Sequence, residues 1–437
     1  MNKIFIAGSA ALLMMASCKP NIEPATPTKG SADFTRYIAL GNSLTAGYAD
    51  GTLYRSGQEN SYPSMLAKAF LPAGGGAFKQ PLLPGNAGWP GFKRVLGMST
   101  GCDGSVSLGP VLYSGQPDTA GSSMSVAGSG PYNNLGVPGI KLVHYTVAGY
   151  GLLNPYARRF YSTPATQSPI SVALTSGATF FSIWLGSNDV LAYATSGGEG
   201  AVGGIGANDI SPREAFKGTY DALVSGMVSG GAKGVLINIP DVTSVPYFTT
   251  VPIKGLALSR QGQVDSLNAA YAALGITFSL GANYFIIQDA TAAGGRRQIR
   301  EGEYLLLTVP QDSIKCRGWG SRTPIPKQFV LDATEVSNIK SATADFNQVI
   351  SDNAKQYGLG LVDANAYLKS LQSGIIFNGV TFTPTFVTGG AFSLDGVHLT
   401  PRGYALVANE IIRVINATYG STLGTVDVNR YDGVRLP

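Results

Sequence analysis

Charged side chains, histidines and cysteines are all scarce in this chain of 437 residues. Asp, Glu, Lys and Arg make up 13% of the sequence, about half the usual ~25%. A disordered chain is therefore excluded, because it would combine much charge with little apolar residue, whereas 44% of this sequence is hydrophobic. Only 2 histidines and 3 cysteines occur, and they form no cluster with the spacing of metal ligands. We expect no metal and no other cofactor.

The formal net charge of +5 is small for this length, and no block of Lys and Arg is interleaved with aromatic residues. Both observations argue against a nucleic-acid partner. Glycine is abundant by contrast, with 57 residues, roughly twice the usual share of ~7%. This profile suits a loop-rich exported protein better than a cytosolic one.

The N-terminus has the pattern of a targeting segment. A short positive start is followed by apolar and small residues over 4–16, a stretch shorter than the ~20 residues that span a bilayer. We predict a signal peptide over residues 1–17. Residues 15–18 resemble a bacterial lipobox, which would make Cys18 the lipidated first residue of the mature protein. A plain secretory signal with an incidental cysteine is the alternative.

Residues 18–33 are rich in Pro, Thr and Lys and predict a lipidated, flexible tether. The expected location is outside the cytoplasm, with the chain lipid-anchored to a bacterial membrane on its periplasmic face or at the cell surface. In such an oxidising compartment Cys102 and Cys316 could pair, although sequence does not decide whether their geometry permits a disulfide.

Alternating strands and helices indicate βαβ units and a parallel sheet. We expect strands at residues 34–40, 178–185, 233–239 and 359–362, and helices at 63–70, 212–229, 261–274, 332–357 and 401–419. The continuous apolar strands fit a sheet that is covered on both faces. The predicted fold is a three-layer α/β/α sandwich with about five mainly parallel strands.

Two stretches interrupt this alternation. Residues 71–131 are rich in Gly, Pro and Ser and predict a loop insertion over one face of the core. Residues 277–331 predict a second insertion, with a hairpin between 284–288 and 298–308. The remaining boundaries are a catalytic domain over 34–420 and a C-terminal tail over 421–437.

The chemistry-bearing residues lie in four short motifs. In the first, residues 39–45, Ser43 follows a strand and a glycine at the mouth of the next helix. Its hydroxyl should face the carboxyl edge of the sheet, where open α/β folds bind ligands. Taken alone, Ser43 is more simply a helix cap.

The second and third motifs offer donors for a developing negative charge. In residues 133–139, Gly136 can bring its backbone N–H close to a ligand, although an ordinary turn explains the pattern equally well. In residues 186–189, Asn188 follows a strand and offers a side-chain amide as an oxyanion donor. Its alternative role is a helix cap.

The fourth motif, residues 394–401, places Asp395 three residues before His398. That spacing lets the carboxylate reach one imidazole nitrogen and leaves the other nitrogen free, as a catalytic triad requires. The other histidine, His144, has no acid nearby in the sequence. His398 is therefore the better candidate for the base.

Together and in this order, the four motifs resemble the SGNH hydrolases, also called GDSL-like lipases and acylhydrolases. The resemblance spans about residues 35–415 and implies a flavodoxin-like sheet. It implies Ser43 as nucleophile, His398 as base and Asp395 as the residue that orients it. The implied oxyanion donors are the N–H groups of Ser43 and Gly136 and the side chain of Asn188. One departure is Asn42, which stands where the family's Gly-Asp-Ser-Leu motif has Asp.

The expected activity is ester hydrolysis through an acyl-enzyme. The aromatic residues of the insertions are scattered in polar loops and form no long apolar stripe. This favours a short acyl ester, such as an acetylated glycan or another small ester. The alternatives are a long-chain lipase or phospholipase, and a catalytically inactive exported binding protein on the same scaffold.

Overall fold

A five-stranded parallel sheet forms the centre of the structure, a computed structural model that describes residues 26–118 and 120–435. Its strands lie in the order β13-β6-β5-β1-β4, and every neighbouring pair is parallel. Their bounds are β1 Tyr37–Gly41, β4 Asn134–Gly136, β5 Phe180–Trp184, β6 Lys233–Ile237 and β13 Gly360–Val362. Read in chain order, this is the flavodoxin-like arrangement. The predicted α/β fold class is confirmed.

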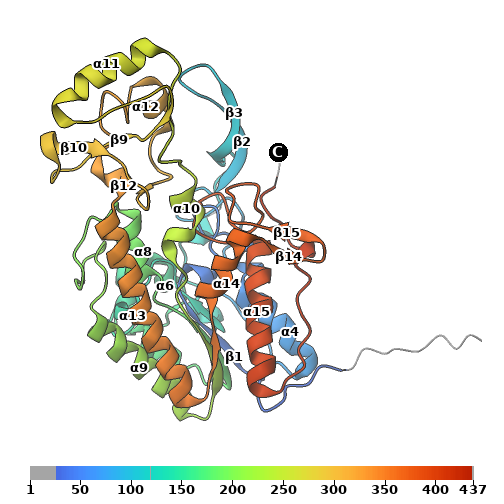
Figure 1. Cartoon of the computed structure of the whole chain (residues 1–437). Helices are drawn as coiled ribbons and strands as arrows, with labels where there is room; N and C mark the ends of the chain where they lie inside the picture. Colours follow the sequence, from blue (N-terminus) through green and yellow to red (C-terminus); the bar gives the residue numbers. More distant parts are fainter. Residues whose placement is uncertain (1–25, 119, 436–437) are drawn as a thin grey trace, which may run out of the picture.

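Helices cover both faces of the sheet (Figure 1). On one side α9 (Arg213–Ser229) packs against α13 (Ala333–Tyr357), and on the other side α4 (Tyr62–Phe70) packs against α15 (Pro401–Tyr419). All residues of β1 and β5 are consequently buried. The continuous apolar strands in the sequence are therefore explained by burial on two faces.

The long helices begin and end at the residues that the sequence favours. Asp332 and Glu335 accept hydrogen bonds from each other's backbone N–H at the start of α13, which is a capping box. At the start of α15 the Thr400 hydroxyl accepts from the N–H of Gly403, and the helix ends at Gly420 in the left-handed region. The remaining helices and strands of the core are α2 Ser43–Ala46, α3 Arg55–Glu59, α5 Tyr150–Leu153, α6 Pro155–Phe160, α7 Pro169–Leu174, α8 Asn188–Thr195, α10 Pro246–Thr249, α14 Ala364–Ser370, β14 Ile375–Phe377 and β15 Val380–Phe382.

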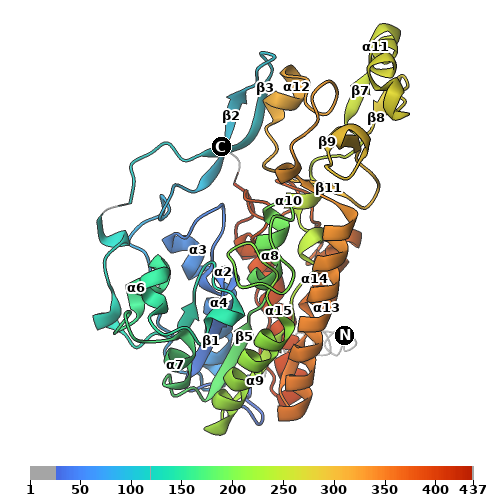
Figure 2. The same ribbon diagram turned by 90° about the vertical axis from the view of Figure 1, so that its left-hand side faces the viewer.

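The first insertion contains a regular hairpin. Strands β2 (Arg94–Thr100) and β3 (Val106–Leu112) pair in antiparallel register over their whole length. The hairpin projects above the carboxyl edge of the sheet (Figure 2). The sequence predicted only loop here, because glycines and serines interrupt the alternation of apolar residues that marks a strand.

The second insertion forms a small lobe with apolar clusters of its own, beyond the same edge of the sheet (Figure 1). One cluster begins at Val251, and α11 (Gln261–Tyr271) contributes to the other. The lobe therefore starts before residue 277, where we expected it to start. Its elements include α12 Gln311–Cys316 and the strand pairs β7 Leu256–Leu258 with β8 Gly281–Asn283, β9 Ile286–Gln288 with β10 Arg296–Gln298, and β11 Tyr304–Leu305 with β12 Val330–Leu331.

The predicted hairpin in this lobe needs a correction in register. Its first strand, β9, pairs with Arg296–Gln298, whereas the apolar residues that suggested the second strand pair with β12. Short apolar runs indicate strands but do not identify their partners, because register is set by packing on one face.

A disulfide between Cys102 and Cys316 joins the two insertions. Cys102 lies in the turn between β2 and β3, and Cys316 is the last residue of α12. The bond closes a sequence separation of 214 residues and ties the tip of the hairpin to the lobe. It resolves a pairing that the sequence left open.

The two ends of the described chain pack against α15. Ser31 N–H donates to the carbonyl of Tyr419, and Thr28 N–H donates to the Thr422 side chain. The end of the predicted tether thus belongs to the folded body, and Leu423 and Val428 of the tail are buried. Residues 1–25, with the predicted signal peptide and Cys18, lie outside the described residues. No helix within residues 26–118 and 120–435 is long and apolar enough to cross a membrane.

Candidate active site

Three of the four motifs follow neighbouring strands at one edge of the sheet. Ser43 comes after β1, Asn188 after β5, and the turn at residues 137–140 after β4. Since β1 lies between β4 and β5, this is the point where the strand order reverses, and open α/β sheets bind ligands there.

The backbone around Ser43 is held by its neighbours. Asn42 is buried, and its side-chain oxygen accepts from the N–H of Leu44 at 3.0 Å, so it caps the short helix α2. Gly41 has no room for a side chain, because a Cβ there would lie 1.9 Å from Thr45 Oγ1. Asn42 therefore performs by hydrogen bonding a capping role that needs no charge.

A hydrogen-bonded chain joins Ser43, His398 and Asp395. Ser43 Oγ lies 2.8 Å from His398 Nε2, and His398 Nδ1 lies 2.8 Å from Asp395 Oδ2. The His398 side chain is 14% exposed and Ser43 is 7% exposed. This is the order in which a nucleophile, a base and an orienting acid are arranged for acyl transfer.

Both oxygens of Asp395 are saturated with donors. Oδ1 accepts from the backbone N–H groups of Val397 and His398, each at 2.8 Å. Oδ2 accepts from His398 Nδ1 at 2.8 Å and from the Gly51 N–H at 2.9 Å. A carboxylate held in this way cannot rotate away from the imidazole without losing several bonds.

The same contacts set the charge state of Asp395. Burial alone would raise the pKa of its carboxyl group, but the positive charge of protonated His398 and the hydrogen bonds outweigh burial and hold the pKa well below its usual value. Asp395 is therefore ionised when His398 takes up a proton, and it stabilises the imidazolium.

Two further residues support His398 from the segment that follows α2. The Tyr48 ring packs beside the imidazole, with ring centroids 4.6 Å apart. Asp50 accepts from the Leu394 N–H at 3.0 Å and donates its own N–H to Ser393 Oγ at 3.0 Å. Sequence analysis missed this segment, although Asp50-Gly51 is a dipeptide that signals a turn.

Asn188 lines the same pocket as Ser43 and His398. Its Nδ2 donates to the carbonyl of Ile140 at 2.9 Å, which fixes the amide plane and leaves its second N–H available. Within the described residues, the backbone N–H of Ser43 has no acceptor. Both groups can therefore donate to a ligand oxygen.

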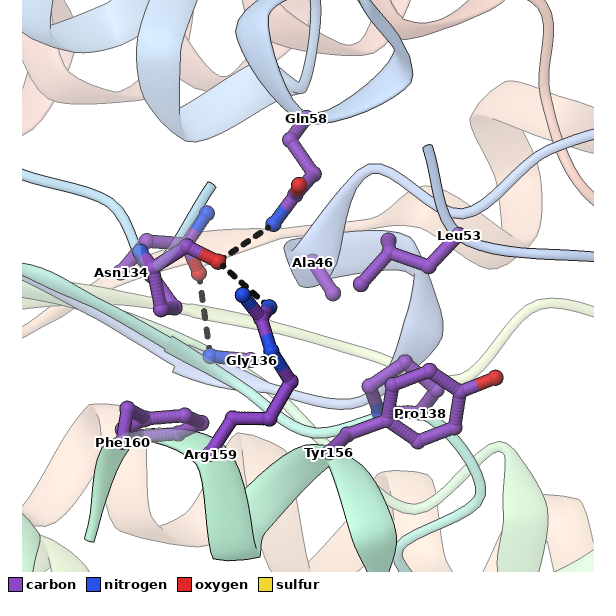
Figure 3. Close-up of a pocket in the computed structure, with 10 residues that line it drawn as sticks. Ala46, Leu53, Gln58, Asn134, Gly136, Pro138, Tyr156, Arg159 and Phe160 are labelled. Carbon is purple, nitrogen blue, oxygen red and sulfur yellow. Dashed lines mark hydrogen bonds between the residues drawn. The ribbon is translucent and has the colours of Figure 1, made fainter. Parts of the chain in front are cut away.

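The second motif is arranged differently from our expectation for Gly136. Its N–H already donates to the Asn134 side-chain oxygen at 3.0 Å (Figure 3). Gly136 lacks a side chain for a packing reason, because a Cβ would lie 2.5 Å from Ala46 N. It brings β4 and α2 close together.

Gly139, three residues further on, is the exposed corner of this motif. It has φ +79° in a turn closed by the Ile140 N–H and the Val137 carbonyl, and Pro138 precedes it, as in a type II turn. In the described part of the chain its N–H has no acceptor, and Asn188 is bonded to the adjacent residue. The Pro-Gly pair was the available sequence signal for this donor.

Asp189 and His144 lie outside this chain of contacts. Asp189 is fully buried and accepts from the Leu142 N–H and the Ser211 hydroxyl, both at 2.7 Å, so it anchors the segment after Gly139. His144 contacts Tyr150, and burial lowers its pKa, as does the charge of Lys141. Neither residue bonds to Ser43 or His398.

A small apolar pocket opens beside Ser43 and His398. Its volume is about 40 Å³. Its walls are mostly apolar and come from the segments after β1, β5 and β6 and from the loop that carries His398. The apolar residues are Leu44, Leu191, Pro240, Val242, Val245 and Val397. Pockets for drug-sized ligands are roughly ten times larger.

Comparisons with known proteins identify a family for this chain. The family model described as GDSL-like Lipase/Acylhydrolase matches residues 37–411. No curated protein matches the sequence. Among solved structures, an SGNH hydrolase from Slackia heliotrinireducens is 12% identical, with 88% of this chain and 100% of that chain covered and a TM-score of 0.31.

Two further solved structures are similar. A GDSL-like lipase from Parabacteroides merdae is 11% identical, with 90% of this chain and 99% of that chain covered and a TM-score of 0.34. An extracellular lipase from Streptomyces rimosus is 13% identical, with 87% and 98% covered and a TM-score of 0.34.

Proposed function

Because this chain belongs to the GDSL-like lipase/acylhydrolase family, we propose that it is a serine ester hydrolase that works through an acyl-enzyme on Ser43. The chain of two 2.8 Å contacts from Ser43 through His398 to Asp395 supports this most directly. Ser43 Oγ attacks the ester carbonyl while His398 Nε2 takes its proton. Asp395 holds Nδ1–H and stabilises the imidazolium. His398 then protonates the departing alcohol, and water releases the acid.

The negative charge on the carbonyl oxygen requires donors that are already in place. We assign this role to the backbone N–H groups of Ser43 and Gly139 and to the side chain of Asn188. Gly139 replaces Gly136 in the assignment, because the Gly136 N–H is already bonded to Asn134.

The pocket beside Ser43 supports a short acyl group. A volume of about 40 Å³ and apolar walls suit an acetyl or propionyl chain better than a fatty chain. We therefore propose small acylated alcohols and acetylated glycans as the substrates. A long-chain lipase would need the pocket to open.

A series of p-nitrophenyl esters tests the acyl preference. We expect kcat/KM to be highest for acetyl and propionyl esters and to fall for octanoyl and lauroyl esters, because the longer chains exceed the pocket. Acetylated xylan and a phospholipid vesicle, assayed beside them, compare the two natural substrate classes. A rate that climbs steadily toward the lauroyl ester, or clear phospholipid cleavage, would sink the short-acyl proposal.

We further propose that the protein is exported and anchored by lipid on Cys18. The disulfide between the insertions supports an oxidising compartment. Cys18→Ser should move the protein from the membrane fraction to the soluble fraction, because the acyl chains are lost. Retention of the variant on membranes after a salt wash would contradict a lipid anchor.

A further inference from the structure

Arg94, the first residue of β2, lies against the segment that supports the triad. Its backbone N–H donates to the Asp50 carbonyl at 2.8 Å. Its guanidinium lies over Gly51, where a Cβ would be 2.0 Å from Arg94 Nη1 and 3.9 Å from Asp395 Cβ. Gly51 therefore has two structural roles. Its N–H bonds to Asp395, and the absence of a side chain leaves space for the guanidinium.

The Arg94 guanidinium is a half-buried cation without a partner. Among residues 26–118 and 120–435, no acceptor lies within hydrogen-bond or ion-pair distance of it. Asp395, the nearest triad group, already receives four donors and cannot take another. Nearby Arg435 differs, because it pairs with Asp432. The planar fork of Arg94 donors thus remains free for an external acceptor, and its geometry matches a carboxylate.

Two tyrosines place Arg94 on the His398 side of the site. Tyr48 packs on the His398 ring, and the Tyr247 N–H donates to the Gly396 carbonyl at 2.9 Å. Burial raises the pKa of Tyr48 to about 12 and also raises that of Tyr247, while the positive charge of Arg94 opposes both shifts. The Tyr48 hydroxyl also donates to the Gly51 carbonyl at 2.6 Å, so Tyr48 and the Arg94 guanidinium lie against the same glycine.

Arg94 lies apart from the acyl pocket. It does not line the apolar pocket beside Ser43. It lines a separate cavity of about 550 Å³, whose other charged lining residues are Lys93, Arg435, Asp50 and Asp432. Because His398 protonates the leaving alcohol, the alcohol portion of a bound ester extends on the His398 side. An acyl group in the apolar pocket and an alcohol portion near Arg94 are thus compatible.

We propose that Arg94 is a specificity-determining residue that binds a carboxylate on the alcohol portion of the ester substrate. The proposal rests on the esterase function proposed above. It narrows the substrate class to esters whose alcohol portion carries a carboxylate, such as acetylated acidic sugars. The hairpin that carries Arg94 is fixed at its base by Asp50 and at its tip by the Cys102–Cys316 disulfide. The backbone that carries Arg94 is therefore fixed before the substrate arrives.

Two acetyl esters that differ only in charge test the proposal, 4-acetoxybenzoate and the neutral 4-acetoxybenzamide. The measured quantity is the ratio of their kcat/KM values, and comparison of this ratio between variants cancels the intrinsic reactivity of each ester. Arg94→Gln should lower the ratio roughly tenfold to a hundredfold, the range for losing hydrogen bonds to a charged group. Arg94→Lys should give an intermediate ratio, because it keeps the charge and loses the bidentate geometry.

Arg317→Gln is the matched control, since Arg317 is an exposed cation of the second insertion and its loss changes the net charge equally. It should leave the ratio unchanged. Turnover of the neutral ester by Arg94→Gln reports that this variant is folded. An unchanged ratio in Arg94→Gln, or an equal fall of the ratio in Arg94→Gln and Arg317→Gln, would overturn the role of Arg94. Either result would leave the proposed esterase function standing. Hydrolysis of neither ester by the wild type would overturn the esterase function and this inference with it.

Discussion

The Gly51 N–H and the His398 imidazole bond to the same oxygen of Asp395, at 2.9 Å and 2.8 Å. Gly51 follows the nucleophile by only a few residues, whereas Asp395 and His398 lie near the other end of the chain. This bond therefore connects the loop that carries the nucleophile to the loop that carries the acid and the base. It helps to hold the His398 imidazole opposite Ser43.

Asn188→Ala should lower turnover by about 10²–10³, because one oxyanion donor is lost while the nucleophile and base remain. A reactive fluorophosphonate should still label the variant. Asn208→Ala, which removes an exposed amide, is the control and should keep wild-type turnover. Unchanged turnover in Asn188→Ala would remove Asn188 from the site.

Asn42→Asp should keep both fold and activity, since a carboxylate oxygen can accept the Leu44 N–H in place of the amide oxygen. Asn42→Ala removes that acceptor and should lower the free energy of unfolding by about 1 kcal/mol. Chemical denaturation and p-nitrophenyl acetate turnover measure the two effects. Equal stability of Asn42→Ala and the wild type would show that the cap contributes nothing.

Replacing both cysteines of the disulfide by serine should destabilise the protein and alter its substrate preference. The free energy of unfolding should fall by about 2–5 kcal/mol, because a closed loop of 214 residues is released in the unfolded state. The ratio of the two acetoxy esters should fall as well, since the hairpin that holds Arg94 loses its attachment at the tip. Thermal unfolding and the ester ratio provide the two measurements, and a variant with wild-type values for both would contradict the prediction.

Asp189→Asn should remove a pH dependence of stability. Burial raises the pKa of Asp189 to about 6, against its hydrogen bonds, whereas an unfolded Asp titrates near ~3.9. Between these values the folded wild type binds more protons than the unfolded chain, so its stability falls as pH rises. The amide cannot ionise, and the variant should gain on the order of 2 kcal/mol relative to the wild type between pH ~4 and ~7. Denaturant titrations at both pH values measure this gain. If the free energies of unfolding of the variant and the wild type differed by the same amount at both pH values, the prediction would be contradicted.

The sequence predicted the elements whose signals are local. The apolar residues of β5, the proline at the start of α15 and the Asp332 cap each identify their element without knowledge of the rest of the chain. The strand β4 was not predicted, because a strand of three residues is too short to show a hydrophobic period. The β2–β3 hairpin was not predicted, because its glycines and serines interrupt the alternation of apolar and polar residues that marks a strand.

In the candidate site, too, some residues could be identified from the sequence and others only from the fold. Asp395 and His398 are three residues apart, so their contact follows from spacing. Ser43 was identified only through the resemblance of the four motifs together to a known family. Gly51 and Tyr48 contact the triad only through the fold, and Arg94 lies against Gly51. No sequence spacing relates these residues to residue 395. The choice between Gly136 and Gly139 depended on which N–H already has an acceptor, and this is known only once Asn134 is placed.

Labelling with a fluorophosphonate, followed by mass spectrometry of the peptides, tests the triad most directly. The wild type and His144→Ala should each carry one covalent adduct on Ser43. Ser43→Ala should carry none, and His398→Ala should react far more slowly, since loss of a triad member costs roughly 10⁴–10⁶ in rate. An adduct on another serine, or equal labelling of His398→Ala and the wild type, would contradict a mechanism in which His398 activates Ser43.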